Sequence, residues 1–158
     1  MNGGLRITEV IDLDHEWPML APLLRGLHEH HLSLMDATLR EDWEERQKAG
    51  IRDQSREGDA IILIAIDAGR PIGLVHGHIA EHPIIDDRTG FVDNAYVHPD
   101  ARRRGVLSAL LARIEEWFKN NGADAAQLNV VVGNVEATQV WEAKGYKPYM
   151  ERLRKDLD

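Results

Sequence analysis

Residues 98–111, HPDARRRGVLSALL, join the end of a strand to the start of a helix, and the rest of the chain is interpreted around them. The first amide groups of a helix lack partners inside it and carry its partial positive charge, so they form a natural phosphate site. Gly105 removes a Cβ that would hold an anion away from the backbone, and three arginines add donors that suit phosphate: Arg102, Arg103 and Arg104. The stretch predicts a phosphorylated ligand at this helix start, although arginines in such a place can equally form a solvated turn.

Composition limits the class of protein. A chain of 158 residues that is 43% hydrophobic and 29% charged is expected to form one folded domain over residues 1–158. The net charge of -8 argues against nucleic-acid binding and mildly favours a cationic substrate or partner. The lack of cysteine excludes a cysteine nucleophile. No signal-type leader and no membrane-spanning apolar run are visible, so we expect a cytoplasmic protein without membrane association.

Apolar periodicity and turn residues predict ten elements. The first three are a strand at 5–11, a helix capped by Asp14 and running to about 35 but broken or offset by Pro18 and Pro22, and a polar helix at 38–56. Three strands follow, at 59–66, 72–81 and 91–97, and then a helix from Val106 that Asn121 and Gly122 close. The last three are a strand at 126–132, a short helix capped by Asn134 that stops at Gly145, and a strand at 146–153. The order β-α-α-β-β-β-α-β-α-β predicts an α/β fold in which a mixed sheet carries helices on its faces.

Histidines form two groups of candidate site residues. His28 and His31 share a face of the first helix while His30 points elsewhere, and an exposed or half-buried helix face explains them better than a metal site, so no metal is expected. His76 and His78, in the second strand of the expected hairpin, point to one face because side chains alternate along a strand. These two can line a ligand groove and move protons near neutral pH, or they can be hydrogen-bonded histidines of the sheet.

Two motifs resemble those of the GNAT acetyltransferase superfamily. Residues 94–111, NAYVHPDARRRGVLSALL, are similar to the strand, turn and helix that carry the family's (Gln/Arg)-x-x-Gly-x-(Gly/Ala) signature for acetyl-CoA. Residues 134–146, NVEATQVWEAKGY, are similar to the family's Asn-x-x-Ala-x-x-x-Tyr-x-x-x-Gly-(Phe/Tyr). Both occur in the family's order and spacing, and the element order matches over essentially the whole chain. The resemblance implies the GNAT-like N-acyltransferase fold.

The resemblance also implies where acetyl-CoA binds as co-substrate. The strand at 127–132 would splay from its neighbour and leave a cleft for the thioester, and Asn134 and Trp141 would lie near the pantetheine. The backbone of Ala95, Tyr96 and Val97 would pair with the pantetheine arm. The CoA pyrophosphate would be held by the backbone of Arg103, Arg104, Gly105, Val106, Leu107 and Ser108, with Arg102 at the first signature position.

The chain departs from the family pattern at two positions. Leu107 replaces a small residue, and its side chain would either crowd the pyrophosphate or turn into the core. Trp141 replaces the tyrosine that often protonates the departing thiolate, and an indole N–H is no useful proton source. CoA could leave unaided, since its thiol should be about as acidic as cysteine, with a pKa of about 8.5. Alternatively Tyr146 or Tyr96 substitutes, or the chain binds acyl-CoA and catalyses poorly.

The resemblance implies direct transfer of an acetyl group from acetyl-CoA to an amine in a ternary complex. The amine must lose a proton, and Asp93 lies where the family often places a base, although it can equally be a structural hydrogen-bond acceptor. His78 and Glu81 are weaker candidates for the base. Backbone N–H groups near Val97 could polarise the thioester carbonyl.

The acceptor and the assembly stay open. The acceptor would be an amine of a small molecule or a protein, and acidity hints at polyamines or aminoglycosides; residues 28–56 are expected to shape its pocket. Homodimers through terminal strands are common in the family, but nothing in this sequence shows one. The alternatives are a non-catalytic acyl-CoA-binding module of the same fold and, more distantly, another protein that binds a phosphorylated ligand.

Overall fold

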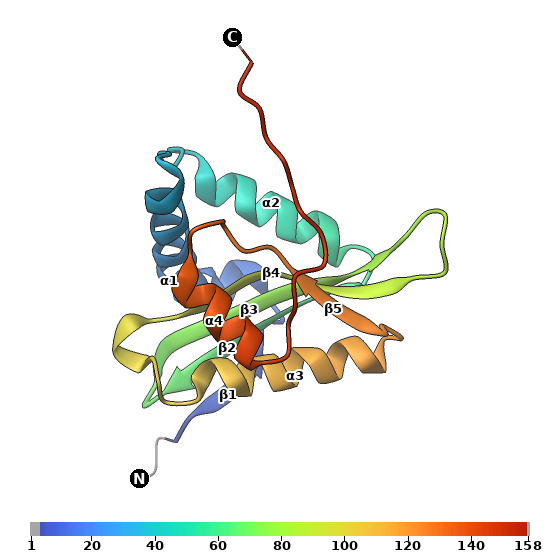
Figure 1. The fold of residues 1–158 in the computed structure, drawn as a ribbon. Helices are drawn as coiled ribbons and strands as arrows, with labels where there is room; N and C mark the ends of the chain where they lie inside the picture. The colour runs from blue at the N-terminus through green and yellow to red at the C-terminus, as the bar shows by residue number, and fades with distance from the viewer. Residues whose placement is uncertain (1–3, 158) are drawn as a thin grey trace.

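Five strands form one mixed sheet in the computed structural model, which describes residues 4–157 (Figure 1). The strands, in their order across the sheet, are β1 (Arg6–Glu9), β2 (Ala60–Asp67), β3 (Arg70–Glu81), β4 (Arg88–Val97) and β5 (Ala125–Leu128). Neighbours are antiparallel except β4 and β5, which are parallel and are connected through helix α3 (Val106–Asn120). The expected α/β fold with a mixed sheet is therefore confirmed.

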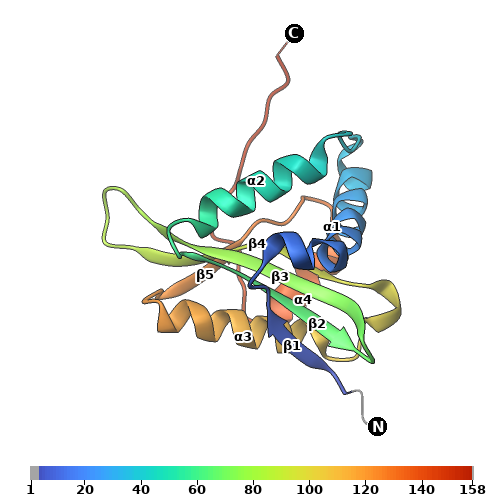
Figure 2. The ribbon, with the colours of Figure 1, turned by 180° about the vertical axis from the view of Figure 1, so that it is seen from behind.

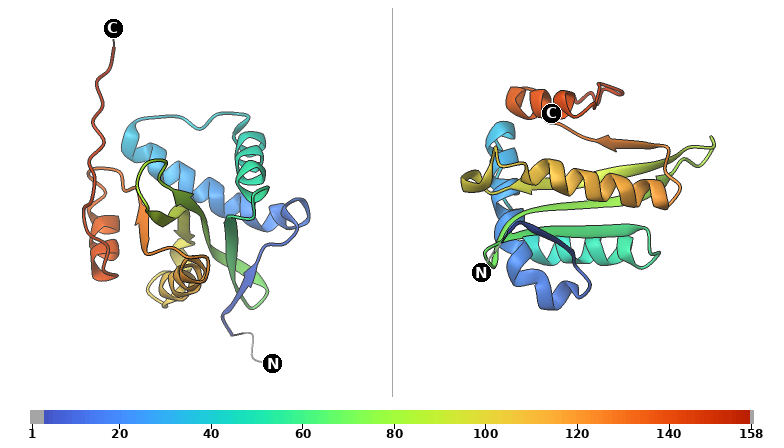
Figure 3. Two further views of the ribbon diagram at one scale, coloured as in Figure 1. Left: turned by 90° about the vertical axis from the view of Figure 1, so that its right-hand side faces the viewer. Right: turned by 90° about the horizontal axis from the view of Figure 1, so that it is seen from below.

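Helices cover both faces of the sheet. Helices α1 (Leu13–Met35) and α2 (Trp43–Ser55) pack on one face and α3 on the other, where α4 (Val135–Ala143) lies beside it (Figures 2 and 3). Strand β2 is a continuous apolar run because its alternate side chains enter two different cores. Ile62, Ile64 and Ile66 pack against α1 and α2, whereas Ile61, Leu63 and Ala65 pack in the core on the side of α3.

Helix α1 is capped two residues earlier than the sequence predicts, and it runs through both of its prolines. Its N-cap is Asp12, whose carboxylate accepts a 3.0 Å hydrogen bond from the backbone N–H of His15. Asp14 lies in the first turn instead and pairs with Lys48 of α2 at 2.8 Å. Pro18 and Pro22 are exposed on the outer side of the helix, where water can solvate the carbonyls that they leave without a donor. The expected break at these prolines is wrong.

Helix α2 begins at Trp43 and not near residue 38. Helix α1 ends where Asp36 adopts a left-handed conformation, with φ of 50°, and residues 37–42 then turn the chain toward α2. Arg40 and Arg46 both pair with Asp42, at 2.8 and 2.7 Å, and hold this connection in place. The helical period of the sequence does not reveal such a turn, because a polar helix and a polar loop have similar composition.

The long hairpin of β3 and β4 contains a β-bulge. Strand β4 starts at Arg88, three residues before its expected start, because pairing with β3 continues to Glu81. Asn94 pairs with His76 and Val92 pairs with Gly77, so that Asp93 is an extra residue between them. The bulge reverses the alternation: Val92 faces the core under α3, while Asn94 faces α1 and α2.

The strand expected at residues 146–153 is absent. Residues 147–157 are exposed and run away from the body of the protein, as Figure 1 shows for the red end of the chain. Strand β5 is also shorter than expected, ending at Leu128 and not near Val132. A strand needs a neighbour with free hydrogen-bonding groups, and a β5 of four residues offers little edge to a following segment. No helix in the described part of the chain is both long and apolar enough to cross a lipid bilayer.

Candidate active site at the β4–β5 split

The sheet opens between β4 and β5. Their parallel pairing runs from Thr89 with Ala125 to Val92 with Leu128 and then ends, while β4 continues for five more residues. Beyond that point β5 and the chain toward α4 diverge from β4, as the view from below in Figure 3 shows. Residues 93–97 therefore have one strand edge that no strand of residues 4–157 covers, and it includes Ala95, Tyr96 and Val97, which the family resemblance predicts to pair with pantetheine.

The start of α3 faces this opening without a cap of its own. Arg103 and Gly105 both have left-handed backbone conformations, with φ of 61° and 77°, which turn the chain sharply into the helix. In residues 4–157 no side chain accepts a hydrogen bond from the first amides of α3, those of Val106, Leu107 and Ser108. Side chains cap α1 and α4, whereas α2, like α3, has no side-chain cap. The amides of α3 are the uncapped ones beside the open edge of β4, and they are left available for an anion.

The three arginines of the turn have different environments. The Nε of Arg102 donates to the carbonyl of Val97 at 3.1 Å, and its guanidinium lies over the ring of Tyr96. Arg104 pairs with Asp67, the last residue of β2, at 2.6 Å. Arg103 is exposed and makes no hydrogen bond or ion pair with any residue that the structure describes. Arg102 and Arg104 thus fasten the turn to the sheet, and Arg103 remains free to meet an anion.

The side chains of Leu107 and Ser108 lie in the first turn of α3 and leave the predicted pyrophosphate site open. Leu107 packs against the core under α3, so its side chain does not crowd the exposed amides. Ser108 accepts a 2.6 Å hydrogen bond from the Nζ of Lys144, at the end of α4. The sequence did not single out Lys144, which brings a further positive charge to the predicted pyrophosphate site and has no distinctive signal apart from its place just before Gly145.

Three predicted residues, Asn134, Trp141 and Tyr146, lie within or next to helix α4, near the split. Asn134 is buried and accepts a 3.2 Å hydrogen bond from the N–H of Ala137, which confirms it as the cap. Trp141 is half-buried and packs edge-on against Tyr146, with ring centroids 5.5 Å apart. Tyr146 donates its hydroxyl hydrogen to Glu115 at 2.8 Å, and burial together with this carboxylate raises the pKa of Tyr146 well above its ordinary value. Its proton is therefore directed to α3 and is held more tightly than in water.

Asp93 and His78 form a pair beside the split. The Oδ2 of Asp93 lies 2.6 Å from the Nδ1 of His78, and both side chains are largely buried, at 20% and 25% exposed. The bulge turns Asp93 onto the face of the sheet that carries His76 and His78, and the expectation that these two histidines share a face is confirmed. Glu81 lies apart, at the far end of β3, where it pairs with Arg88.

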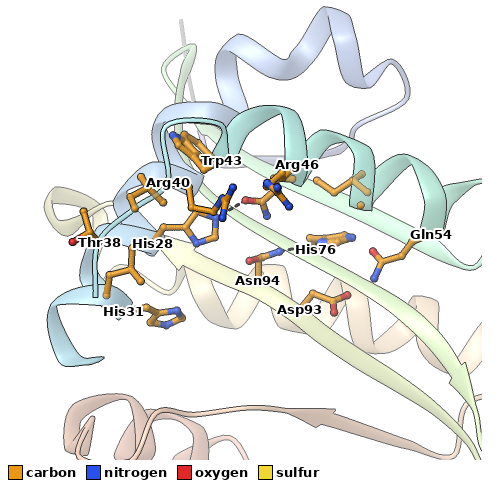
Figure 4. A pocket seen from close by; sticks show the side chains of 15 residues that line it. His28, His31, Thr38, Arg40, Trp43, Arg46, Gln54, His76, Asp93 and Asn94 are labelled. Carbon is orange, nitrogen blue, oxygen red and sulfur yellow. Dashed lines mark hydrogen bonds between the residues drawn. The ribbon is translucent and has the colours of Figure 1, made fainter. Parts of the chain in front are cut away.

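A cavity of about 540 Å³ adjoins this pair, between α1, α2 and the strands β3 and β4 (Figure 4). Its walls come mainly from residues 28–54, and Asp93 and Asn94 lie on the side of the sheet. His28 and His31 both line it, and the ring of His28 packs edge-on against Trp43 at 5.5 Å. The segment from which we expected an acceptor pocket does form a cavity, and it ends where β4 leaves β5.

Two buried polar atoms at this cavity have no hydrogen-bond partner within residues 4–157: the Nε2 of His76 and the Oε1 of Gln54. The Nδ1 of His76 lies 3.0 Å from the side-chain nitrogen of Asn94, which can only donate, so the neutral ring carries its hydrogen on Nε2. Burial lowers the pKa of His76 to about 4, which keeps the ring neutral near pH 7. A buried donor and a buried acceptor beside the cavity are therefore both left without a hydrogen-bond partner in residues 4–157.

Comparisons with known proteins bear on the family and the fold. A family described as "Acetyltransferase (GNAT) family" matches residues 24–146. An uncharacterized N-acetyltransferase, YhfO of Bacillus subtilis (strain 168), is 23% identical over 128 residues, which are 81% of each chain. Among solved structures, the aminoglycoside N-acetyltransferase AAC(6')-Iy, in complex with a bisubstrate analogue of CoA and acetylneamine, is similar with a TM-score of 0.77 at 18% identity over 98% of this chain and 99% of that one. A putative acetyl transferase from Pyrococcus furiosus is similar with a TM-score of 0.76 at 22% identity, over 98% of this chain and 100% of that one.

Proposed function

The chain belongs to the acetyltransferase (GNAT) family, and from that premise we propose that it transfers an acetyl group from acetyl-CoA directly to an amine while both substrates are bound. The observation that carries the proposal is the meeting of three features at one place: the open edge of β4, the uncapped start of α3, and the cavity that contains Asp93. A thioester aligned along β4 would reach that cavity at the bulge, because the pairing with β5 ends there.

The residues that would hold CoA act mainly through their backbone. The amides of Val106, Leu107 and Ser108 would donate to the diphosphate, with Arg103 and Lys144 adding positive charge. The edge of β4 would pair with the amide groups of pantetheine in the way that one strand pairs with another. The Leu107 side chain packs against the core, and together with the conformation of Gly105 this leaves the backbone accessible, so the residues present fit this ligand.

Asp93 is the residue that we assign to the proton of the attacking amine. It lines the cavity, whereas His78 does not, so the carboxylate is the member of the pair that the amine would meet. An ammonium group would hydrogen-bond to Asp93 and pass its proton to the pair as the nitrogen attacks. His78, at 2.6 Å, would orient the carboxylate and share the added charge.

Departure of CoA needs no tyrosine in this proposal. A thiol with a pKa of about 8.5 is a good leaving group near neutral pH. Trp141 stands where the family has a tyrosine, and the hydroxyl of Tyr146 is already committed to Glu115. We therefore assign both residues to packing beside the split.

Titration with CoA tests the binding half of the proposal. In an amide NMR spectrum, CoA should shift the signals of Val106, Leu107 and Ser108, and the amide of His15, which Asp12 already caps, should stay unchanged. If CoA leaves the α3 amides where they are, the proposed function is wrong. If CoA binds but no amine consumes acetyl-CoA, the chain is a binding module and not an enzyme.

The variant Asp93→Asn tests the catalytic half. It keeps the shape of the side chain but removes the group that takes the proton, so we expect kcat to fall by about 10² to 10⁴ with little change in the affinity for CoA. Asp53→Asn, on the exposed surface of α2, is the matched control and should leave kcat unchanged. A kcat for Asp93→Asn within a few-fold of the unchanged protein would remove Asp93 from the mechanism.

A further inference from the structure

The cavity beside Asp93 carries opposite charges at its two ends. Figure 4 shows Arg40 and Arg46 on the wall formed by α2 and the preceding loop, with Asp93 on the sheet below them. Among the residues that the structure describes, Asp93 is the only carboxylate in the lining, and Arg40 and Arg46 are the only guanidinium groups. The cavity lining therefore carries two positive side chains and one negative one, whereas the chain as a whole has a net charge of -8.

The arginine end of the cavity has more positive charge than negative charge. Arg40 and Arg46 both pair with Asp42, at 2.8 and 2.7 Å, so two guanidinium groups share one carboxylate. Asp42 takes the Nε and one Nη2 hydrogen bond of Arg40 and only the Nε of Arg46. The remaining N–H donors are unused by Asp42, and both arginine side chains stay more than half exposed. Such a fork of donors fits a carboxylate or a phosphate.

Two of the three histidines that line the cavity do not change this balance near pH 7. Burial lowers the pKa of His76 to about 4, and burial followed by the charge of His30 lowers the pKa of His31. Both rings are therefore neutral and supply hydrogen bonds rather than charge. His76 and Gln54 also line the cavity, and the buried Nε2 of His76 and Oε1 of Gln54 are a donor and an acceptor without partners in residues 4–157.

We propose, on the premise of the acetyl transfer above, that the acceptor amine also carries an anionic group, which Arg40 and Arg46 bind while the amine meets Asp93. The acceptor class is then an amino acid or an amine bearing a phosphate. A polycationic amine would place further ammonium groups against two arginines with no carboxylate in the lining to receive them, apart from the Asp93 that holds the reacting amine.

Matched pairs of acceptors test this class with the intact protein and acetyl-CoA. The panel consists of free amino acids against their primary amides, phosphoethanolamine against ethanolamine, and kanamycin as a polycation. We expect kcat/KM to be at least tenfold higher for the anionic member of a pair, and the pair that responds tells a carboxylate from a phosphate. Higher kcat/KM for the amides, for ethanolamine or for kanamycin overturns the inference while acetyl transfer itself stands.

Variants then connect the preference to the arginines. Arg40→Gln and Arg46→Gln should each raise KM for the anionic acceptor at least fivefold, leave kcat/KM for its uncharged partner within twofold, and leave KM for acetyl-CoA unchanged. Arg25→Gln is the matched control: Arg25 is exposed on α1, pairs with Glu29 and lies outside the cavity, so its removal should change none of these constants. An equal loss for both members of a pair would contradict the assignment. Absence of transfer to every amine, with CoA bound, would instead refute the proposed function.

Discussion

His76 is a buried titratable residue of the described chain that resists protonation where it lies. Its side chain is 4% exposed, Nδ1 receives the amide hydrogen of Asn94, and burial lowers its pKa to about 4. In the unfolded chain the same ring has its ordinary pKa of about 6.5. The difference makes His76 a source of pH-dependent stability that the folded state alone creates.

Acid should therefore destabilise the protein through His76. Between about pH 6.5 and pH 4, His76 is protonated in the unfolded chain but not in the folded chain. The free energy of unfolding should therefore fall as the pH drops through this range, by on the order of 3 kcal/mol from this residue. Urea unfolding measured across this range should show the loss, and His76→Gln should flatten the curve. His15→Gln, at an exposed position of α1, should not. Parallel curves for His76→Gln and the unchanged protein would contradict this account.

The variant Tyr146→Phe tests whether the hydroxyl of Tyr146 has a structural or a catalytic role. Because its hydroxyl donates to Glu115, Tyr146→Phe should lower the free energy of unfolding by about 1 kcal/mol and leave kcat within about twofold. Tyr149→Phe, whose hydroxyl belongs to an exposed residue, should change neither quantity. Steady-state kinetics and urea unfolding on the same preparations distinguish the cases, and a large loss of kcat for Tyr146→Phe would make it the proton donor.

At the scale of elements, strand β4 determines where the site lies. Its bulge at Asp93 and the end of its pairing with β5 at Val92 fall at neighbouring residues, so one strand turns a carboxylate toward the cavity and opens its edge at the same point. Strand β4 also approaches α3 closely. Gly90 lies directly under the ring of Phe118, which is fully buried, and a Cβ on Gly90 would overlap that ring.

Gly90→Ala should force α3 away from β4. The overlap with a rigid buried ring is expected to lower the free energy of unfolding by about 1–3 kcal/mol. Gly50→Ala in α2 is the matched control, because a Cβ there meets open space, and it should stabilise the protein by about 0.5–1 kcal/mol. Chemical unfolding of both variants checks the pair, and a neutral Gly90→Ala would mean that Phe118 moves aside freely.

At the scale of the whole molecule, the carboxyl-terminal segment stands apart from the folded body. Four of its apolar or aromatic side chains are more than 70% exposed: Tyr149, Met150, Leu153 and Leu157. In residues 4–157 the one side-chain hydrogen bond of this segment joins Arg154 to Asp156 within it. The segment therefore contributes little to the stability of this fold.

Truncation after Tyr149 should leave the folded body intact. We expect the free energy of unfolding to change by less than about 0.5 kcal/mol, because the removed side chains bury almost nothing against the rest of the chain. Thermal or urea unfolding of the shortened protein, compared with the full chain at one concentration, provides the measurement. A clear loss of stability would show that the segment packs against the protein in solution.

The sequence by itself determined most of the elements and the family. The period of the apolar residues in α3, the cap Asn134, and the glycine and arginines before Val106 are local signals, because helix starts and turns depend on residues close together in the chain. From such signals the order of the first nine elements and the shared face of His76 and His78 could be predicted, and the phosphate site at the start of α3 stays a prediction. The start of α2 could not, because a polar helix and a polar loop have similar composition, and the helix through Pro18 could not, because it depends on which side of the helix faces water.

Only the tertiary structure decided how these parts combine into a site. The extra residue at Asp93 is visible only when β3 lies beside β4, and the absence of a last strand depends on how much edge β5 offers. Residues far apart in the chain come together through packing: Lys144 of the second motif contacts Ser108 of the first, and Arg46 and Asp93 line one cavity. Hydrogen bonding across strands and burial between layers are long-range, and they created the split, the polar cavity and the neutral His76.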